Sequence, residues 1–209
     1  MTGIEFWEEI FGRRAAVEIE IGPGTGSFLC HVAEQHPEVN FLAIESSRSR
    51  AERLTRLLEE RGLRNARVVH AAAQCVIQHC VPPGSVQAYH IYFPDPWWKR
   101  RHHKRRLFTP DFARALARSL SPGGQVYLAT DVLFVWTLAR NCLEQHGGLV
   151  LTYLRPPARP VRTAFEQKGL RRGAQIWEGV FALLPQLSEQ AATSQEVVRI
   201  GNRPSESHP

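Results

Sequence analysis

A single carboxylate, Asp95, lies between two prolines and is followed by two tryptophans and a run of cations. The prolines restrict φ and remove backbone donors, so the acid is held on a stiff segment. Residues 99–106 carry six cations and two histidines, and no acid follows before Asp111. A rigidly held acid beside aromatic rings and a strong positive field suits chemistry on a base within a polyanion. A solvated basic loop is the competing interpretation, and Asp95 with its aromatic neighbours argues against it.

Three glycines, Gly22, Gly24 and Gly26, lie between two acids that end consecutive apolar runs, Glu20 and Glu45. Glycine permits a sharp turn and lets a ligand approach the backbone closely. The spacing is GxGxG, not the GxGxxG of dinucleotide binding, and the Lys-Ser/Thr of a phosphate-binding P-loop is missing. Glu20 would repel a pyrophosphate but tolerate an amine, and Glu45 stands where acids commonly bond ribose hydroxyls. S-adenosylmethionine fits this pattern, because it carries a ribose, a sulfonium and an amino group but no phosphate. A glycine turn needed only for packing is the alternative.

Short apolar runs alternate with amphipathic segments of helical length, and these elements must position the acids and the glycine turn. We expect strands at residues 17–21, 40–44, 66–70, 86–93, 125–129, 149–154 and 176–184, and helices at 27–35, 48–60, 112–120 and 132–146. Such alternation is typical of a parallel α/β sheet. The connection between the last two strands has little helical pattern, which favours an antiparallel pair at one edge. We therefore predict an α/β fold with a mostly parallel sheet and an antiparallel edge strand.

The composition favours one globular domain with a positive surface. Of the 209 residues 43% are hydrophobic, and the net charge is +6, which favours an acidic partner. We expect one domain over residues 1–185 and a disordered polar tail over 186–209. No long apolar run, secretory signal or lipidation motif is present, so we expect no membrane association. Four scattered cysteines form no CxxC pair, so we expect no metal and a reduced, cytoplasmic chain.

Five short motifs follow one another along the chain. They are EIGPGTG at residues 20–26, AIE at 43–45, FPDPWWKRRHHKRR at 93–106, ATD at 129–131 and RPVRTAFE at 159–166. In this order they resemble the motifs of bacterial tRNA (guanine-N7-)-methyltransferases of the TrmB type. The similarity runs from about residue 17 to residue 184, and its long central segment is far more specific than the glycine turn alone.

The resemblance implies an S-adenosylmethionine-dependent methyltransferase (Rossmann-like) fold. It implies an enzyme that transfers the methyl group of S-adenosylmethionine to N7 of a variable-loop guanine in tRNA. In that family pattern Glu20, Glu45 and Asp95 contact the methyl donor, with Asp95 at the catalytic centre. The implied partner is tRNA, with neither a metal nor a membrane, and a monomer and a homodimer remain equally open.

On the tRNA side, the resemblance assigns Lys99, Asp131, Thr163 and Glu166 to the bound guanosine. The cations around Lys99 would hold phosphates, which adds affinity without reading sequence. From the residues alone, Asp131 could equally cap the helix expected after it, because Asp is a good N-cap. Thr163 and Glu166 also have the spacing of a capping box. Both interpretations of these residues stay open.

Two positions depart from the family pattern. Family members usually carry an acid near the adenine of the donor, whereas this chain has alanine at residues 71–73, with Ala72 at that place. Losing one hydrogen-bond acceptor would weaken donor binding by roughly 1–3 kcal/mol unless the backbone or Gln74 replaces it. Trp98 stands where the family often has a smaller polar residue, and it adds either a stacking surface or a core side chain.

The chemistry of guanine N7 indicates what such a site must supply. N7 carries a lone pair and no proton, so an in-line displacement needs no strong base, and positioning should supply most of the acceleration. Positive charge appears on the purine, where a fixed carboxylate stabilises it and accepts the N–H groups of the base. Asp95, with Asp131 or Glu166 beside it, fits that role.

Two alternative functions remain on the sequence. One is another S-adenosylmethionine-dependent methyltransferase that acts on a different RNA or on a small molecule, and the six-cation run disfavours a small neutral substrate. The other is a catalytically decayed RNA-binding relative, with the alanines at 71–73 as its mark. The presence of Glu20, Glu45 and Asp95 disfavours decay.

Overall fold

The structure is a computed structural model that describes residues 2–154 and 162–183. In chain order its elements are α1 (Gly3–Phe11), β1 (Val17–Ile21), α2 (Ser27–Gln35), β2 (Asn40–Glu45), α3 (Arg48–Glu60), β3 (Ala66–His70), α4 (Ala73–His79), β4 (Val86–Tyr92), the 3₁₀ helix η1 (Arg100–Arg105), α5 (Pro110–Ser119), β5 (Leu120–Thr130), α6 (Leu133–Gly147), β6 (Leu149–Leu154), α7 (Ala164–Leu170) and β7 (Trp177–Leu183). No helix among these residues is long and apolar enough to cross a bilayer. The expected alternation of strands and helices is confirmed.

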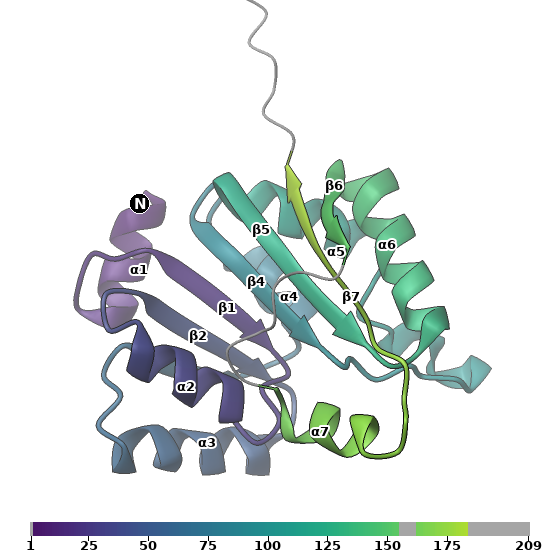
Figure 1. Ribbon diagram of the computed structural model, residues 1–209. Coiled ribbons are helices and arrows are strands. Elements are labelled where there is room, and N and C mark those ends of the chain that lie inside the picture. The colour runs from purple at the N-terminus through teal and green to yellow at the C-terminus, as the bar shows by residue number, and fades with distance from the viewer. Residues whose placement is uncertain (1, 155–161, 184–209) are drawn as a thin grey trace, which may run out of the picture.

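The strands form one sheet in the order β3-β2-β1-β4-β5-β7-β6 (Figure 1). Neighbours from β3 across to β5 are parallel, whereas β7 is antiparallel to both β5 and β6. The predicted α/β fold with a mostly parallel sheet and an antiparallel edge is therefore confirmed. The strand that runs against the others is β7, one position in from the edge, and β6 is the edge strand.

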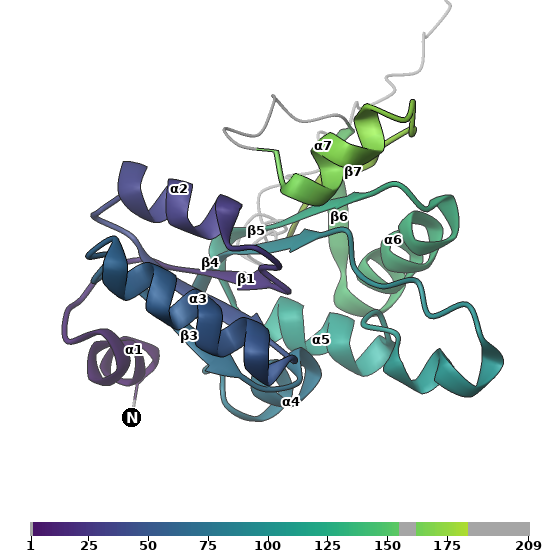
Figure 2. The same cartoon turned by 90° about the horizontal axis from the view of Figure 1, so that it is seen from below.

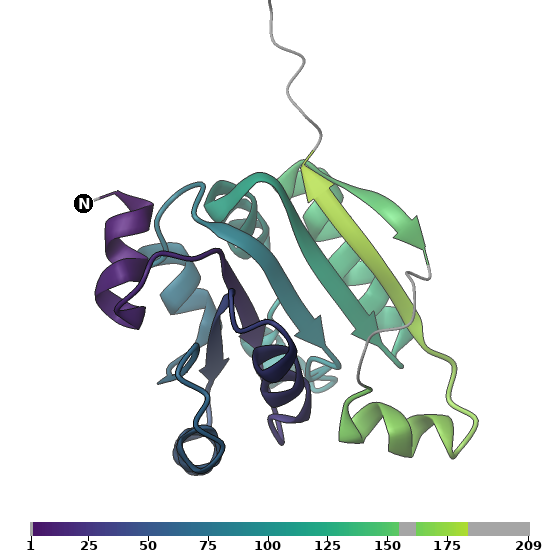
Figure 3. The ribbon, with the colours of Figure 1, turned by 60° about the vertical axis from the view of Figure 1, so that its left-hand side comes forward.

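The strand order reverses between β1 and β4. From β1 the chain builds outward through β2 and β3, and it then returns to place β4 and β5 on the other side of β1. In such sheets, ligands bind outside the carboxyl ends of the strands at the point of reversal. Helix α7 lies at this same end of the sheet in two views (Figures 1 and 3).

Strands β1 and β2 are enclosed on both faces. Every residue of β2 is buried, and in β1 only Glu18 is partly exposed, as expected for parallel strands covered by helices. Their register pairs Ile21 with Ile44, and the N–H of Gly22 donates to the carbonyl of Ile44 at 2.9 Å. The glycine turn and Glu45 therefore leave the sheet side by side.

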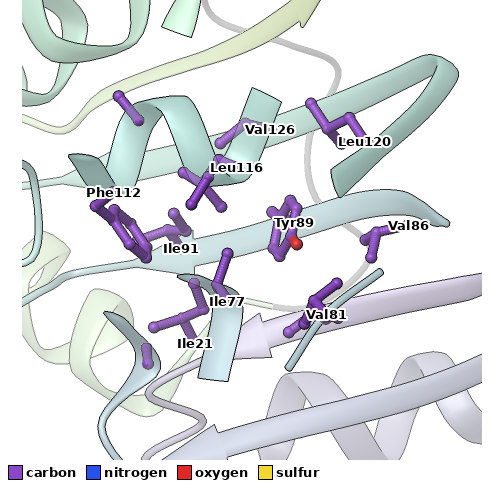
Figure 4. Packing of buried hydrophobic residues seen from close by; sticks show 14 of the residues in the cluster. Ile21, Ile77, Val81, Val86, Tyr89, Ile91, Phe112, Leu116, Leu120 and Val126 are labelled. Carbon is purple, nitrogen blue, oxygen red and sulfur yellow. The ribbon is translucent and has the colours of Figure 1, made fainter. Parts of the chain in front are cut away.

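Helices cover the sheet in two layers, with α2 on one side and α5 and α6 on the other (Figure 2). The larger apolar cluster joins α1, α4, α5 and α6 to the strands, and Figure 4 shows Tyr89, Ile91 and Phe112 within it. The second cluster lies on the opposite face, where α2 and α3 pack through residues such as Phe28 and Leu54. The result is a three-layer α/β sandwich.

One half of the second face carries no helix among the described residues. No described helix covers β4, β5 and β7 there (Figures 1 and 3), and a cavity of about 650 Å³ is lined in part by these strands. At its base the ring of His90 stacks on Tyr127 with 5.1 Å between centroids. The His90 ring nitrogens lie 2.8 Å from a carboxylate oxygen of Glu18 and 2.9 Å from the hydroxyl of Tyr92. This aromatic face has no counterpart among the predicted site residues.

Several short helices were not predicted from the sequence. The connection between β6 and β7 shows little helical pattern in the sequence, yet α7 lies there and begins after Thr163. Helices α1 and α4 were not predicted either. Helix α1 begins with a capping box in which Thr2 and Glu5 exchange hydrogen bonds. Helices α4 and α7 have seven residues each, about two turns, which is too short for a 3.6-residue period to be recognised.

Strand β5 also starts earlier than expected. It begins at Leu120 and takes in the Ser-Pro-Gly-Gly segment before the strand expected at residues 125–129, while α5 ends at Ser119. The predicted tail at 186–209 lies outside the described residues. All the described strands belong to one sheet, and the extent of the single domain, residues 1–185, stays a prediction.

Candidate active site

A cavity of about 650 Å³ opens at the carboxyl ends of β1, β2, β3 and β4, at the point where the strand order reverses. Its walls come from the glycine turn, the loops after β2 and β3, the loop after β4 and the segment around η1. The lining residues are Ile21, Gly22, Ile44, Ser46, Ala71, Ala72, Ala73, Gln74, Pro94, Asp95, Trp97, Lys104, Arg105, Leu107 and Thr109. Its volume is in the range of small-molecule and cofactor sites.

The three glycines of the turn have different roles. Gly22 and Gly24 have φ values of 72° and 57°, and a Cβ at either position would meet open space. Gly22 lines the cavity, so its bare backbone leaves room for a ligand there. Gly26 is buried, and a Cβ there would overlap Leu54 on α3. The packing interpretation therefore holds for Gly26, and the ligand interpretation fits Gly22, whereas Gly24 does not line the cavity and its contact with the donor stays a prediction.

Glu20 lies beneath α2 and is only 4% exposed. The backbone N–H of Leu29 donates to its carboxylate, and Oε2 has no hydrogen-bond partner among the described residues. Burial raises the pKa of Glu20 to about 8. Ile19 and Ile21 on the same strand pack into the opposite cluster. Side chains alternate along a strand, so Glu20 faces α2 and does not line the cavity.

Glu45 ends β2 with its side chain 2% exposed and firmly held. Its Oε1 accepts hydrogen bonds from the N–H of Ser47 at 2.7 Å and from Nη2 of Arg50 at 2.9 Å. This bond to Glu45 raises the pKa of Arg50, with a smaller contribution from Asp95. Ser46, the next residue, lines the cavity. The carboxylate is therefore fixed at the cavity margin beside a cation.

The wall formed by residues 71–73 offers methyl groups and backbone only. Ala72 is exposed and stands immediately before α4 in an extended conformation. Gln74 lines the same wall, and its Nε2 donates to the carbonyl of Arg106 at 3.2 Å. The amide nitrogen is thereby engaged, so the amide oxygen is the atom of Gln74 that could stand in for a carboxylate acceptor.

Asp95 reaches the cavity on a strained segment. It lines the wall together with Pro94 and Trp97 and is exposed. Phe93 and Trp97 have φ values of 52° and 45°, the left-handed region that aromatic residues rarely occupy. Such outliers cost about 1–3 kcal/mol each and cluster at functional sites. The N–H of Phe93 donates to the carbonyl of Ala129 at 2.7 Å, which holds the loop to β5.

The cationic run folds into η1, and two of its members turn toward the cavity. Lys104 and Arg105 line the wall, and the guanidinium of Arg105 lies 5.1 Å from the ring centroid of Trp97. Lys99 is exposed and does not line the wall. The sequence marked the run as a whole, and the 3₁₀ turn decides which cations face inward. Leu107 and Thr109 were also missed, because nothing in their pattern distinguishes them from loop residues.

Asp131 follows β5 and is half-buried. The N-cap of α6 is Val132, and no side chain caps that helix. The N–H of Val132 donates instead to the hydroxyl of Thr130 at 3.2 Å. The capping interpretation of Asp131 was therefore wrong, while its contact with the tRNA guanosine stays a prediction.

Thr163 caps α7, because its hydroxyl accepts from the N–H of Glu166 at 3.1 Å. Glu166 is 3% exposed, and its Oε1 lies 3.7 Å from Nη1 of Arg162. The exposed ring of Phe165 lies 5.4 Å from the ring of Phe93, which brings α7 against the loop that carries Asp95. The capping interpretation of Thr163 is confirmed, and its contact with guanosine stays a prediction.

The predicted donor-site residues thus converge on one end of the sheet. Most of them lie on the cavity wall or at its margin, and one lies behind it. Gly22, Ala72 and Asp95 share the cavity wall, and Glu45 is held at its margin. Glu20 lies behind the glycine turn. Among the described residues, no group of three or more His, Cys, Asp or Glu side chains could hold a metal ion.

The comparisons with known proteins find the same resemblance. Residues 14–179 match a protein family described as a putative methyltransferase. The tRNA (guanine-N(7)-)-methyltransferase of Cupriavidus necator is 40% identical over 185 residues, covering 84% of this chain and 69% of that protein. The enzyme of the same name from Hydrogenovibrio crunogenus is 40% identical over 179 residues, covering 82% and 74%.

Solved structures agree on the fold. The 16S rRNA methyltransferase KamB superposes with a TM-score of 0.64 at 17% identity, over 86% of this chain and 93% of that one. A SAM-dependent methyltransferase from Aquifex aeolicus gives 0.56 at 12% identity, over 86% and 89%. These likenesses show an S-adenosylmethionine-dependent methyltransferase fold. Because the sequence match runs through the glycine turn, the Asp95 loop and α7 alike, the chain belongs to the methyltransferase family that contains the bacterial tRNA (guanine-N7-)-methyltransferases.

Proposed function

We propose that this protein transfers the methyl group of S-adenosylmethionine to N7 of a guanine in the variable loop of tRNA. One observation carries the proposal: the carboxylate of Asp95 and two cations of η1, Lys104 and Arg105, line the same cavity as Gly22 of the glycine turn. The curated relatives at 40% identity bear the name of this activity. A tRNA substrate places the protein in the cytoplasm.

The donor cavity fits S-adenosylmethionine on the chemistry of its walls. Gly22 and Gly24 hold positive φ angles and leave open space where a side chain would stand. The fixed carboxylate of Glu45 suits ribose hydroxyls, and the alanine wall around Ala72 suits the face of an adenine ring. The buried acid Glu20, next to the glycine turn, suits the ammonium group of the donor. S-adenosylmethionine supplies an electrophilic methyl group on a sulfonium.

Asp95 acts on the acceptor base. Guanine N7 already carries its lone pair, so the protein needs to orient the base rather than remove a proton. An exposed carboxylate on a constrained loop can accept the N–H groups of the purine and stabilise the positive charge that develops there. Asp131 and Glu166, on neighbouring segments, are the acids that would assist it.

The cations of η1 hold the nucleic acid. Most side chains from Lys99 to Arg106 are exposed, so they can reach phosphates from the protein surface. Contacts of this kind supply affinity that falls with salt and carry no sequence information. Thr163, at the start of α7, is the remaining candidate for contact with the guanosine.

The direct test is incubation of the protein with labelled donor and bulk unmodified tRNA, followed by nucleoside mass spectrometry. We expect 7-methylguanosine from the wild type and none above background from Asp95→Asn. A different methylated nucleoside would redirect the assignment to another RNA methyltransferase. Complete absence of methylation, with donor binding intact in calorimetry, would overturn the assignment to tRNA guanine.

One observation favours a second candidate, an RNA-binding relative without catalysis. The wall at residues 71–73 has lost the acceptor that the family usually places there. If this loss abolished donor binding, calorimetry with S-adenosylmethionine would show no heat while tRNA still bound.

A further inference from the structure

A patch of large apolar side chains lies exposed beside the cavity. Trp98, Leu133 and Phe134 are 62%, 54% and 40% exposed. The rings of Trp98 and Phe134 lie 5.9 Å apart at 39°, although one residue follows β4 and the other begins α6. Two distant segments therefore meet to build an aromatic surface that stays open to solvent. Exposed patches of this kind mark interaction sites more often than chance.

Cations frame this patch. The guanidinium of Arg106 lies 4.6 Å from the ring centroid of Phe134. Lys99 and Arg100, which follow Trp98 directly, are exposed. Trp97, the residue before Trp98, lines the donor cavity. The aromatic surface is therefore one residue away from the cavity wall and lies within the positive field of η1.

A core role and a contact between two copies of the chain both fit the patch less well than a nucleic acid does. A core role for Trp98 conflicts with its 62% exposure. A symmetric contact between two copies would bring the cationic segments next to each patch toward one another, which costs free energy through like-charge repulsion. A single-stranded nucleic acid matches both features, because bases stack on aromatic faces while phosphates meet nearby cations.

We propose that Trp98 and Phe134 form a stacking platform for an unpaired tRNA base next to the target guanine. This proposal rests on the proposed function and names the part of the RNA that the outer rim recognises. A target base inside a stack cannot enter a pocket, and unstacking it costs a few kcal/mol. A platform that stacks the neighbouring base offsets part of that cost and leaves the target free to enter.

The first experiment measures the dissociation constant for an unmodified tRNA transcript at one fixed salt concentration. Trp98→Ala should weaken binding by about 5- to 150-fold, the range for one lost base stack. Trp98→Phe keeps an aromatic face and should recover most of the affinity. The matched control is Tyr153→Ala, because Tyr153 is 58% exposed on β6 and does not line the donor cavity. Donor affinity and melting temperature should be unchanged in all three variants.

The second experiment tests whether a base is what the platform holds. An abasic nucleotide is placed on the 5′ or the 3′ side of the target guanine. With the wild type, one of these transcripts should bind more weakly, and with Trp98→Ala the same transcript should lose little further affinity. Fully additive losses would show that the missing base and Trp98 act independently, and they would overturn the proposal.

The remaining outcomes separate the platform from the proposed function. Equal tRNA affinity of Trp98→Ala and the control variant would overturn the platform even if 7-methylguanosine forms normally. A change in sedimentation without a change in RNA affinity would assign the patch to contact between two copies instead. Failure of the wild type to make 7-methylguanosine would overturn the proposed function, whereas the binding experiments would still report whether a base stacks on Trp98.

Discussion

The two sides of the cavity are built in opposite ways. On the donor side, Glu20 and Glu45 are 4% and 2% exposed, and backbone N–H groups hold both carboxylates. On the acceptor side, the residues from Lys99 to Arg105 are exposed, except the half-buried His102. On the donor side, the hydrogen bonds that hold these carboxylates therefore form when the protein folds, before any ligand binds. The acceptor side has its charges in place but gains its contacts only when a polyanion arrives.

This difference predicts how each side responds to change. Substitutions on the donor side remove buried, bonded groups, so they should alter stability together with donor binding. Substitutions on the acceptor side remove solvated groups, so they should alter RNA binding and leave the fold intact. Asp95 lies where the two sides meet, and its loss should affect chemistry alone.

The largest effect is expected from Asp95→Asn. Asn preserves size and turn geometry but removes the charge, so a purely structural Asp95 would be replaced without loss. If the carboxylate stabilises charge on the purine, the rate should fall about 10²–10³-fold, as when one preorganised group is removed. The measurement is single-turnover 7-methylguanosine formation with saturating donor, with Asp111→Asn on α5 as control. Near wild-type turnover would shift attention to Asp131 or Glu166.

Glu45→Ala tests the donor side. A buried carboxylate that bonds ribose hydroxyls is worth roughly 1–3 kcal/mol, so donor affinity should fall about 5- to 150-fold. Titration calorimetry with S-adenosylmethionine measures this, and tRNA affinity should hardly change. The matched control is Glu52→Ala, an exposed acid on α3. Equal affinities of the two variants would remove Glu45 from ribose recognition.

The pH dependence of stability should reveal Glu20. Its pKa is raised from 4.5 to about 8 in the folded protein, so the folded state holds this proton more tightly than the unfolded chain. The stabilisation is complete below pH 4.5 and is lost as pH rises through 8. In that window the free energy of unfolding should fall by up to about 1.4 kcal/mol per pH unit. Glu20→Gln should flatten this slope in urea unfolding, whereas Glu34→Gln on the surface of α2 should keep it.

The acceptor side should make the affinity for tRNA depend on salt concentration. Replacing Arg100, Arg101 and Arg105 together should weaken tRNA binding and reduce the slope of log affinity against log salt by about 0.7 to 0.9 per lost contact. Donor binding and the melting temperature should persist. The matched control replaces three exposed arginines at and after α3, namely Arg48, Arg56 and Arg64. A slope identical to wild type would place the phosphate footprint elsewhere.

The smallest effect is expected from Ala72→Asp. The new carboxylate would supply the acceptor that the family resemblance implies near the adenine, at an exposed position on the cavity wall. We expect donor affinity to rise by a few-fold, the low end of one hydrogen bond. Weaker binding in calorimetry would show that the cavity has repacked around alanine and has no room for the acid.

The donor side was largely predictable because its strands carry strong local patterns. The bounds of β1, α2, α3 and β3 match the sequence prediction to the residue. Glycine spacing placed the turn, and apolar runs placed Glu45 at a strand end. The contact of Glu20 with the methyl donor stays a prediction, and the alternation of Glu18 and Glu20 with isoleucine already shows that both acids share one face.

The acceptor side was predictable in composition but not in geometry. Charge density identified residues 99–106, yet nothing local says that Lys104 and Arg105 turn inward while Lys99 does not. The meeting of Trp98 with Phe134 depends on β4 and β5 lying side by side, which is a property of the sheet. Segments whose arrangement comes from tertiary neighbours are those that propensity describes least well.

The two aromatic residues with left-handed backbone conformations around Asp95 couple the thermal stability of the protein to its rate of methylation. Phe93 and Trp97 each hold a backbone conformation that relaxes in the unfolded chain. A selection for heat resistance alone would therefore favour glycine or asparagine at these positions, because both tolerate positive φ. The selected variants would be more stable to heat, but their backbone would hold the carboxylate of Asp95 less rigidly. Among the selected variants, a higher melting temperature would therefore accompany slower methylation, with the largest difference for substitutions at position 97.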